Sequence, residues 1–208
     1  GNYLRYLRYS EDTEHFVADA FRRETWEFMD WQNWRDKHLT ILLNKAVTKV
    51  PYYRDLWHQK KKSKHDLSWK DLKNWPVLSK EIVRKNPKAF VSDDCNISRM
   101  YKDHTSGTSG TPLEIYQSKE SIRFWYALVE ARWRRWYGVS RKDRWAIFGG
   151  QLIVNYERQK PPFWVWNTGM RQLYCSSYHL KEANIKHYMK ALDSHQVTYI
   201  LGYPSALY

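Results

Sequence analysis

The chain has 208 residues, enough for one domain and part of another. Its 42% hydrophobic content can build a core, and its 35 basic against 22 acidic residues give a formal net charge of +13. Such a surface attracts anions, including nucleotides, nucleic acid and acidic lipid, while no apolar run approaches the roughly 18 residues of a membrane span.

The two cysteines, Cys95 and Cys175, lie far apart in the chain and show no metal-ligand spacing. Two cysteines are too few for a disulfide framework, although one disulfide bond between them is possible. Such a low cysteine content favours a reducing compartment. Residues 1–9 alternate tyrosine, leucine and arginine and do not form a signal peptide, so the cytoplasm is the expected location. No metal site is predicted.

Residues 1–97 predict a helical N-terminal region. Apolar residues over 11–49 recur at helical spacing and stop before Pro51, which is expected to break the helix. Ser79 is placed to cap a short helix over 80–85. The aromatic residues of 11–49 are expected to pack against the body of the domain.

Segments 98–104 and 113–117 predict a β-hairpin, and the loop at its tip is the most distinctive stretch of the sequence. Residues 105–111 contain five hydroxyl side chains and two glycines. Glycine allows close backbone approach, successive N–H groups can cradle an anion, and hydroxyls add uncharged donors. The spacing differs from the P-loop and Rossmann motifs. A phosphate-binding loop over 104–113 is predicted, the alternative being an ordinary polar hairpin loop.

Ser118 is expected to begin a strong helix that ends at Gly138. Apolar side chains repeat along it at helical spacing and are expected to form core, while Arg123, Glu130 and Arg134 lie on the opposite face. The apolar stripe consists of Ile122, Trp125, Tyr126, Val129, Trp133 and Trp136.

The rest of the chain alternates strands and helices. Pro161-Pro162 and Asn167-Thr168-Gly169 mark residues 155–170 as loop. The strand–helix–strand order predicts right-handed crossovers. The predicted fold class is therefore α/β, with N-terminal helices followed by a mostly parallel sheet flanked by helices, and residues 98–208 form the α/β subdomain. The strands are predicted at 144–148, 172–176 and 197–201, and the helix between the last two at 180–193.

Several blocks of sequence resemble one enzyme family. Thr-Ser-Gly-Thr-Ser-Gly-Thr-Pro at 105–112 resembles the T-S-G-[ST]-[ST]-G-x-P loop of the adenylate-forming enzymes, the superfamily of acyl–coenzyme A synthetases. Further blocks resemble phenylacetate–coenzyme A ligases, and some of them a branch of that group in capsular polysaccharide biosynthesis. These blocks are Val50-Pro51-Tyr52-Tyr53-Arg54, Trp75-Pro76-Val77-Leu78-Ser79-Lys80, Phe148-Gly149-Gly150-Gln151, Pro161-Pro162-Phe163-Trp164, Ser176-Ser177-Tyr178-His179-Leu180 and Gly202-Tyr203-Pro204-Ser205.

The resemblance implies a portion of the large N-terminal domain of an acid-activating ligase. Relatives carry an acidic Mg²⁺ ligand, a ribose-binding Asp, a hinge and a catalytic Lys in later sequence, so no catalytic residue is assigned to this chain. The missing C-terminal portion of the same enzyme is an implied partner, and the chain alone is expected to be inactive.

The implied reaction has two steps, in which a carboxylate attacks ATP to give an acyl-adenylate and pyrophosphate, and a thiol then displaces AMP. ATP and Mg²⁺ are the implied cofactors, and the acceptor is coenzyme A, a carrier protein or a sugar. The phosphates are expected at Thr105, Ser106, Gly107, Thr108, Ser109, Gly110 and Thr111, which would stabilise the leaving pyrophosphate. A small carboxylic acid is expected at Tyr178, His179, Gly202, Tyr203 and Pro204; these blocks could equally be a surface histidine beside a helix start and a plain strand-to-helix turn.

Two other classes of function remain open. A basic, tryptophan-rich chain could bind RNA or single-stranded DNA by stacking and phosphate contacts. That function requires exposed aromatic residues on a strand face, whereas most of those here fit buried helical stripes, and the run Lys60–Lys64 is typical of a solvated loop. The chain could also be an inactive adenylation-like scaffold.

Overall fold

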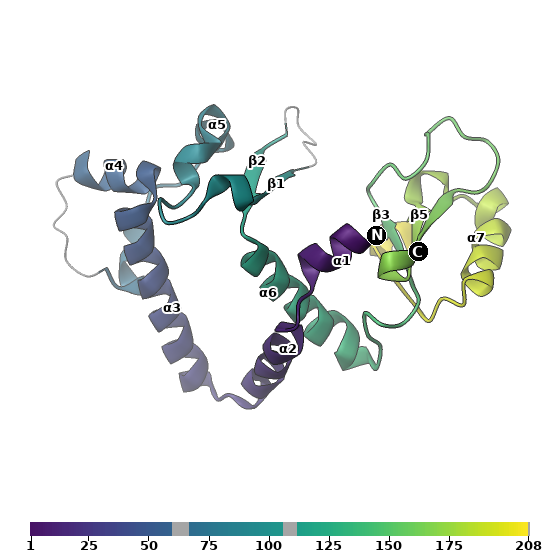
Figure 1. Cartoon of the computed structure of the whole chain (residues 1–208), viewed down its shortest axis with the longest axis horizontal. Coiled ribbons are helices and arrows are strands. Elements are labelled where there is room, and N and C mark those ends of the chain that lie inside the picture. Colours follow the sequence, from purple (N-terminus) through teal and green to yellow (C-terminus); the bar gives the residue numbers. More distant parts are fainter. Residues whose placement is uncertain (60–66, 106–111, 208) are drawn as a thin grey trace. The chain divides into compact units, whose positions relative to one another are not determined.

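The computed structural model describes residues 1–59, 67–105 and 112–207, which form two compact units (Figure 1). The sheet unit combines Gly1–Phe21 with Arg123–Tyr208, and the hairpin unit is the intervening segment Arg22–Ile122. The structure thus divides the chain differently from the predicted regions 1–97 and 98–208, because the first two helices pack with the C-terminal half of the chain.

The hairpin unit is mostly helical. Its core consists of Leu43, Trp57 and Leu67, with Val47 and Trp75 packed against them. The unit contains η1 (Arg23–Thr25), α3 (Phe28–Lys49), α4 (Pro51–Gln59), η2 (Trp69–Asn74), α5 (Lys80–Lys85), η3 (Pro87–Phe90), η4 (Ile97–Arg99), β1 (Tyr101–His104), β2 (Glu114–Gln117) and the start of α6 (Lys119–Val129).

The single helix predicted over 11–49 is wrong in its continuity but right in its end. It is divided into α2 (Thr13–Arg22) and α3, with η1 and two extended residues between them. The predicted break before Pro51 is confirmed, since α3 ends at Lys49. Pro51 begins a separate helix, α4, because proline at the first position of a helix lacks only an N–H that would have no partner within the helix. The short helix at 80–85 is confirmed, and the Ser79 hydroxyl accepts the N–H of Ile82 as its cap.

The predicted hairpin is confirmed. Strands β1 and β2 are antiparallel, and their register runs from Tyr101 opposite Gln117 to His104 opposite Glu114. The side chains of Lys102 and Glu114 form an ion pair across the strands, with 2.6 Å between Nζ and Oε2, and this contact raises the pKa of Lys102.

The sheet unit contains a four-stranded sheet in the order β4-β5-β3-β6. Strand β3 is parallel to β5 and β6, whereas β4 is antiparallel to β5. The sheet is therefore mixed. The expectation of a mostly parallel sheet missed β4, which lies in the predicted loop 155–170. The strands are β3 (Trp145–Gly149), β4 (Trp164–Asn167), β5 (Gln172–Ser176) and β6 (Tyr199–Gly202).

Helices and turns complete the sheet unit. The turn η7 joins β4 to β5 as a hairpin. Asn167-Thr168-Gly169, which predicted a loop over 155–170, therefore form only the turn of this hairpin. Apart from α2, the elements are α1 (Asn2–Arg8), η5 (Glu130–Arg134), η6 (Arg135–Tyr137), η7 (Thr168–Met170), η8 (Ser177–His179), α7 (Glu182–Ser194) and α8 (Pro204–Leu207).

The two faces of this sheet are covered differently. On one face, Ala146, Phe148, Leu173 and Cys175 form a buried core with Phe163 and with Tyr188 and Ala191 of α7. Burial there raises the pKa of the Cys175 thiol to about 12. Because side chains alternate along a strand, Trp145, Ile147, Gln172, Tyr174, Tyr199 and Leu201 belong to the opposite face.

The helix that follows the hairpin buries only part of its predicted stripe, namely Ile122 and Val129. Trp125, Trp133 and Trp136 are 54%, 55% and 56% exposed, whereas Glu130 and Arg134 are buried. Residues Glu130–Arg134 form a turn of π-helix, which holds more residues per turn than an α-helix. This turn shifts Trp133 and Trp136 away from the predicted face, but it does not account for Trp125, which precedes it.

Glu130 and Arg134 are the centre of a buried polar network. The Glu130 carboxylate lies 3.5 Å from Nη1 of Arg134 and accepts the backbone N–H of Arg141 at 3.0 Å. Arg134 donates from Nε to the Tyr199 hydroxyl at 2.7 Å, and its guanidinium lies over the ring of Trp145 at 4.9 Å. The network therefore fixes this helix against β3 and β6.

We expect Glu130→Gln to lower the free energy of unfolding by about 3–5 kcal/mol, because it leaves the buried guanidinium of Arg134 without its charge partner. Urea unfolding followed by circular dichroism measures the change. Glu120→Gln, an exposed position on α6, is the matched control and should change stability by less than about 0.5 kcal/mol. Equal stability of the two variants would contradict the prediction.

Candidate functional site

The structure describes the base of the glycine-rich loop. Thr105 donates its N–H to the carbonyl of Leu113 at 3.0 Å, and the Thr105 hydroxyl accepts the N–H of Leu113 at 3.0 Å. These two bonds continue the β1–β2 ladder by one step and close the loop. The predicted phosphate-binding residues Ser106, Gly107, Thr108, Ser109, Gly110 and Thr111 lie outside the described residues.

The second predicted group of residues lies at the carboxyl ends of the parallel strands. Strand β3 ends at Gly149, β5 at Ser176 and β6 at Gly202, all at one edge of the sheet because the three strands are parallel. This edge is where open α/β sheets commonly bind ligands. The structure thus brings the predicted acid-binding segments 178–179 and 202–204 to the same edge of the sheet, together with residues 149–150, which the prediction did not include.

Hydrogen bonds tie these strand ends to one another. The Ser177 hydroxyl donates to the carbonyl of Gly149 at 2.8 Å, and the Tyr178 hydroxyl donates to the carbonyl of Gly150 at 3.1 Å. Gly202 has no room for a side chain, since a Cβ there would lie 3.1 Å from the carbonyl oxygen of Phe148. Tyr178 and Tyr203 are largely exposed, and Pro204 begins α8.

His179 lies apart from this exposed group, because it is buried with both ring nitrogens engaged. Its Nε2 is 3.1 Å from the carbonyl oxygen of Tyr156, and its Nδ1 is 2.8 Å from the Ser176 hydroxyl. A carbonyl only accepts, so the neutral ring with its hydrogen on Nε2 satisfies both contacts. The ring also stacks on Phe163 with 4.9 Å between centroids. In this arrangement His179 supports η8 and the edge of the sheet.

A cavity of 290 Å³ opens between the sheet and the α6–η5 helix, all within the sheet unit. Tyr203 is the predicted acid-binding residue that lines it, and Gly149 and Gly150 lie at its carboxyl-end rim. Its walls include side chains that the sequence placed in the core stripe or in strands rather than in a site. These are Trp125, Tyr126, Val129, Trp133, Trp145, Ile147, Gln172 and Tyr174.

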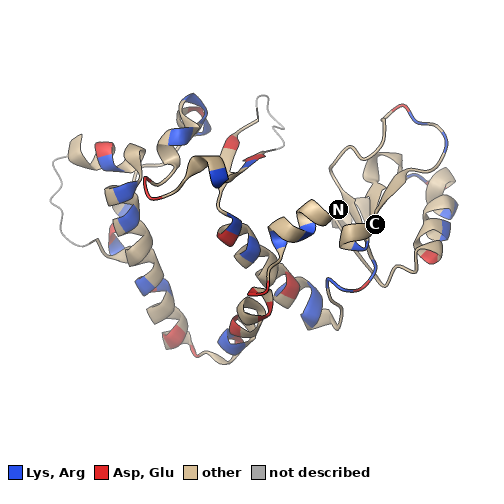
Figure 2. Ribbon diagram, in the orientation of Figure 1, with Lys and Arg blue, Asp and Glu red and all other residues tan. Residues whose placement is uncertain are grey.

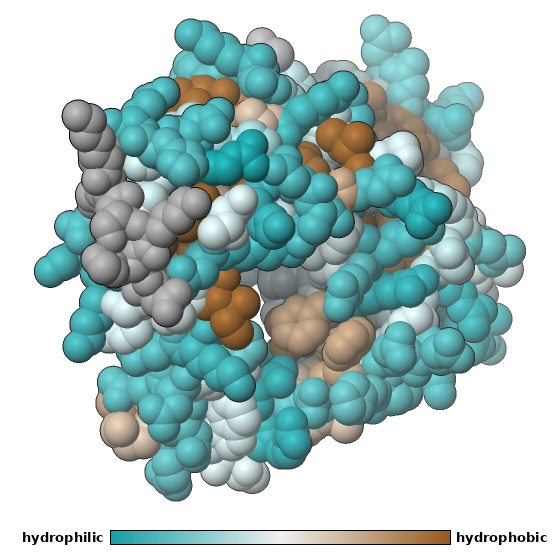
Figure 3. Space-filling view, turned by 60° about the vertical axis from the view of Figure 1, so that its left-hand side comes forward, coloured by the Kyte–Doolittle hydropathy of each residue, from teal (hydrophilic) through white to brown (hydrophobic). Residues whose placement is uncertain are grey.

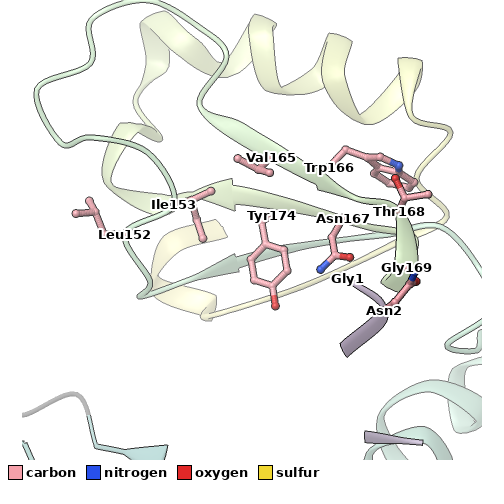
Figure 4. Close-up of a pocket in the computed structure, with 10 residues that line it drawn as sticks. All are labelled: Gly1, Asn2, Leu152, Ile153, Val165, Trp166, Asn167, Thr168, Gly169 and Tyr174. Atoms are coloured by element: carbon pink, nitrogen blue, oxygen red, sulfur yellow. The ribbon is translucent and has the colours of Figure 1, made fainter. Parts of the chain in front are cut away.

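A second, more open hollow of 660 Å³ adjoins this cavity and shares Ile153 and Tyr174 with it (Figure 4). Figure 4 shows the side chains of Tyr174 and Asn167 on the side of the sheet that faces the start of α1. Tyr174 therefore separates two adjoining hollows on the face of the sheet that α7 does not cover.

Within residues 1–59, 67–105 and 112–207, the basic side chains are spread over several elements. Figure 2 shows Lys and Arg on most of the helices, and the sequence of α3 also contains Asp30 and Asp36. The face drawn in Figure 3 is mostly hydrophilic with separate apolar patches. Within the described ranges, no group of three or more His, Cys, Asp or Glu side chains could hold a metal ion. None of the described helices combines the length and hydropathy of a membrane crossing.

Comparison with known proteins finds one informative similarity. The chain is 23% identical to Protein CapK of Staphylococcus aureus over 197 residues, which are 94% of this chain and 42% of that protein. The chain therefore spans less than half the length of this relative. No family model and no solved structure matches the chain.

His179 is buried, whereas its neighbour Tyr178 is exposed, so substitutions at the two positions should differ in their effect on stability. His179→Ala should lower the free energy of unfolding by about 2–4 kcal/mol, because it leaves a cavity and unpairs the Ser176 hydroxyl. Tyr178→Phe removes one exposed hydrogen bond and should cost less than about 1 kcal/mol. Urea unfolding of both variants measures the difference, and a stable His179→Ala protein would overturn the structural role given to this ring.

Proposed function

We propose that this chain is part of an ATP-dependent acid-activating ligase that serves capsular polysaccharide biosynthesis. The proposal rests on the glycine-rich sequence at 105–111 together with its setting, a loop held between two paired strands by the Thr105–Leu113 contacts. A sequence motif gains weight when the expected local structure surrounds it. The similarity to Protein CapK, whose name suggests a capsule gene product, supports the biological role.

The loop would bind the phosphates of ATP. Its seven residues from Thr105 to Thr111 include no charged side chain, so binding would depend on backbone N–H groups and hydroxyls. Donors fixed in place before the reaction stabilise charge as it develops on the leaving pyrophosphate, because they need no reorganisation. Closing the loop at Thr105 and Leu113 would provide part of that fixed geometry.

The acid would bind in the sheet unit. The cavity of 290 Å³ has the size of a small-molecule site and opens near the glycines after β3. Its position at the carboxyl ends of parallel strands is the one expected for a ligand in this class of sheet. Tyr203 and the backbone of Gly149 and Gly150 would line its entrance, and His179 would hold the edge from behind.

The complete reaction belongs to the full-length protein in this proposal. The resemblance assigns the catalytic Lys, the Mg²⁺ ligand and the ribose-binding Asp to sequence that this chain does not contain. We therefore expect the 208-residue chain to bind ligands without catalysing acid-dependent exchange of pyrophosphate into ATP. Exchange by the isolated chain would contradict this division.

The loop is tested in the full-length protein by Gly107→Val and Gly110→Val. A branched side chain prevents the close approach of the backbone to phosphate, so we expect the Kd for ATP to rise about 100-fold, or about 2.7 kcal/mol. Isothermal titration measures the Kd, and circular dichroism checks that the fold is retained. Unchanged affinity in both variants would remove the basis of the proposal.

The base of the loop allows a matched pair of variants. Thr105→Val keeps the shape of the side chain but removes the acceptor for the Leu113 N–H, whereas Thr105→Ser keeps the hydroxyl. We expect ATP affinity to fall about tenfold more in the valine variant, because a lost hydrogen bond is worth about 0.5–1.5 kcal/mol. Equal losses in the two variants would show that this hydrogen bond does not position the loop.

A further inference from the structure

The amide of Gln172 is a buried group that the packing of the chain does not explain. Its side chain is fully buried at the start of β5, yet neither Nε2 nor Oε1 has a hydrogen-bond partner among the described residues. Buried polar groups nearly always have partners, because losing water without replacement is costly. Both atoms of one amide without partners point to a bound molecule that supplies them.

Gln172 lines the 290 Å³ cavity at its inner end. Gln172 and Trp145 are the first residues of neighbouring parallel strands, whereas Gly149 and Gly150 follow the far end of β3. The cavity therefore runs along the strands, and four residue steps correspond to roughly 13 Å. A volume of 290 Å³ over that length has room for one ring and a short chain.

The walls of the cavity are suited to a flat ring. Trp125, Tyr126 and Trp133 contribute rings from the helix side, and Tyr174 and Tyr203 contribute rings from the sheet side. Aromatic side chains bind other rings by stacked or edge-on contacts.

The inner end of the cavity favours an uncharged group. Two of the described cations line the cavity, Arg134 and Arg8. Arg134 is already paired with Glu130 and the Tyr199 hydroxyl, and the Arg8 guanidinium lies over the ring of Tyr126 at 4.4 Å. A carboxylate at this end would therefore compete with Glu130 for Arg134, whereas a hydroxyl could donate to Oε1 of Gln172 or accept from Nε2. The acid group of a ligand is expected at the opposite end, near Gly149 and Gly150.

We propose that this cavity selects a ring-bearing carboxylic acid with a hydroxyl group at the end remote from the carboxylate, and that Gln172 recognises the hydroxyl. The inference rests on the proposed function, because it takes the cavity as the acid site of the ligase. It adds a specificity-determining residue and a feature of the substrate. A site built to bind a hydroxyl group discriminates strongly against an analogue that lacks it.

The binding test uses this chain and two acids that differ in one hydroxyl, 4-hydroxyphenylacetate and phenylacetate. Tryptophan fluorescence reports binding, since Trp125, Trp133 and Trp145 line the cavity. We expect the hydroxylated acid to bind at least tenfold more tightly. Equal affinities, or no binding of either acid at millimolar concentration, would overturn the proposal.

Gln172→Met tests the residue, and Gln159→Met at an exposed loop position is its control. The first variant should lose the preference for the hydroxylated acid, and the control should keep it. Gln172→Met should also unfold at the same urea concentration as the unmodified chain or a higher one, because it removes an amide without partners. A retained preference, or marked destabilisation of Gln172→Met, would show that the amide has a structural role instead.

Pyrophosphate exchange in the full-length protein separates this inference from the proposed function. If both hold, the kcat/KM for the hydroxylated acid exceeds that for phenylacetate at least tenfold, and Gln172→Met abolishes the difference. A binding preference without exchange for any acid would support the site and reject the ligase. Exchange that is equal for the two acids would support the ligase and reject the role of Gln172.

Discussion

The buried pair of Glu130 and Arg134 joins the separate segments of the sheet unit. Glu130 accepts the backbone N–H of Arg141, and Arg134 contacts Tyr199 on β6 and Trp145 on β3. The exposed carboxylate of Glu14 on α2 extends the network through Arg135 and Arg141. Removing two charges from water is costly, so such a pair persists only with further hydrogen bonds of this kind. The position of the α6–η5 helix, and with it one wall of the cavity, depends on this network.

Local signals in the sequence predicted much of the fold. The hairpin at 101–117, the helix cap at Ser79, the helix α7 and the three parallel strands all follow from patterns within a few residues. The failures have non-local causes. The π-turn at Glu130–Arg134 buries charged residues because partners from α2, β3 and β6 reach them, and no repeat within the helix records those partners.

The candidate site was predictable to a similar extent. The blocks at 149–150, 176–179 and 202–204 meet at one edge of the sheet because parallel strands share their carboxyl ends. The sequence could not show that His179 is buried behind that edge, since burial depends on Phe163 and Tyr156 from a distant loop. The sequence alone does not distinguish Gln172, because it is the first residue of a segment with the pattern of a buried strand. A polar residue there is the signal that could have marked the cavity.

The composition of the sheet unit from two distant segments has a consequence for how the protein is made. Helices α1 and α2 leave the ribosome before their packing partners, which begin at residue 123. At about 5–20 residues per second, the intervening hundred residues take roughly 5–20 s to synthesise. The apolar side chains Val17 and Ala20, which pack against Ala127 and Ala131 in the finished protein, have no native partner during that interval. During translation, the apolar side chains of the amphipathic helix α2 therefore wait for the segment that buries them in the folded protein.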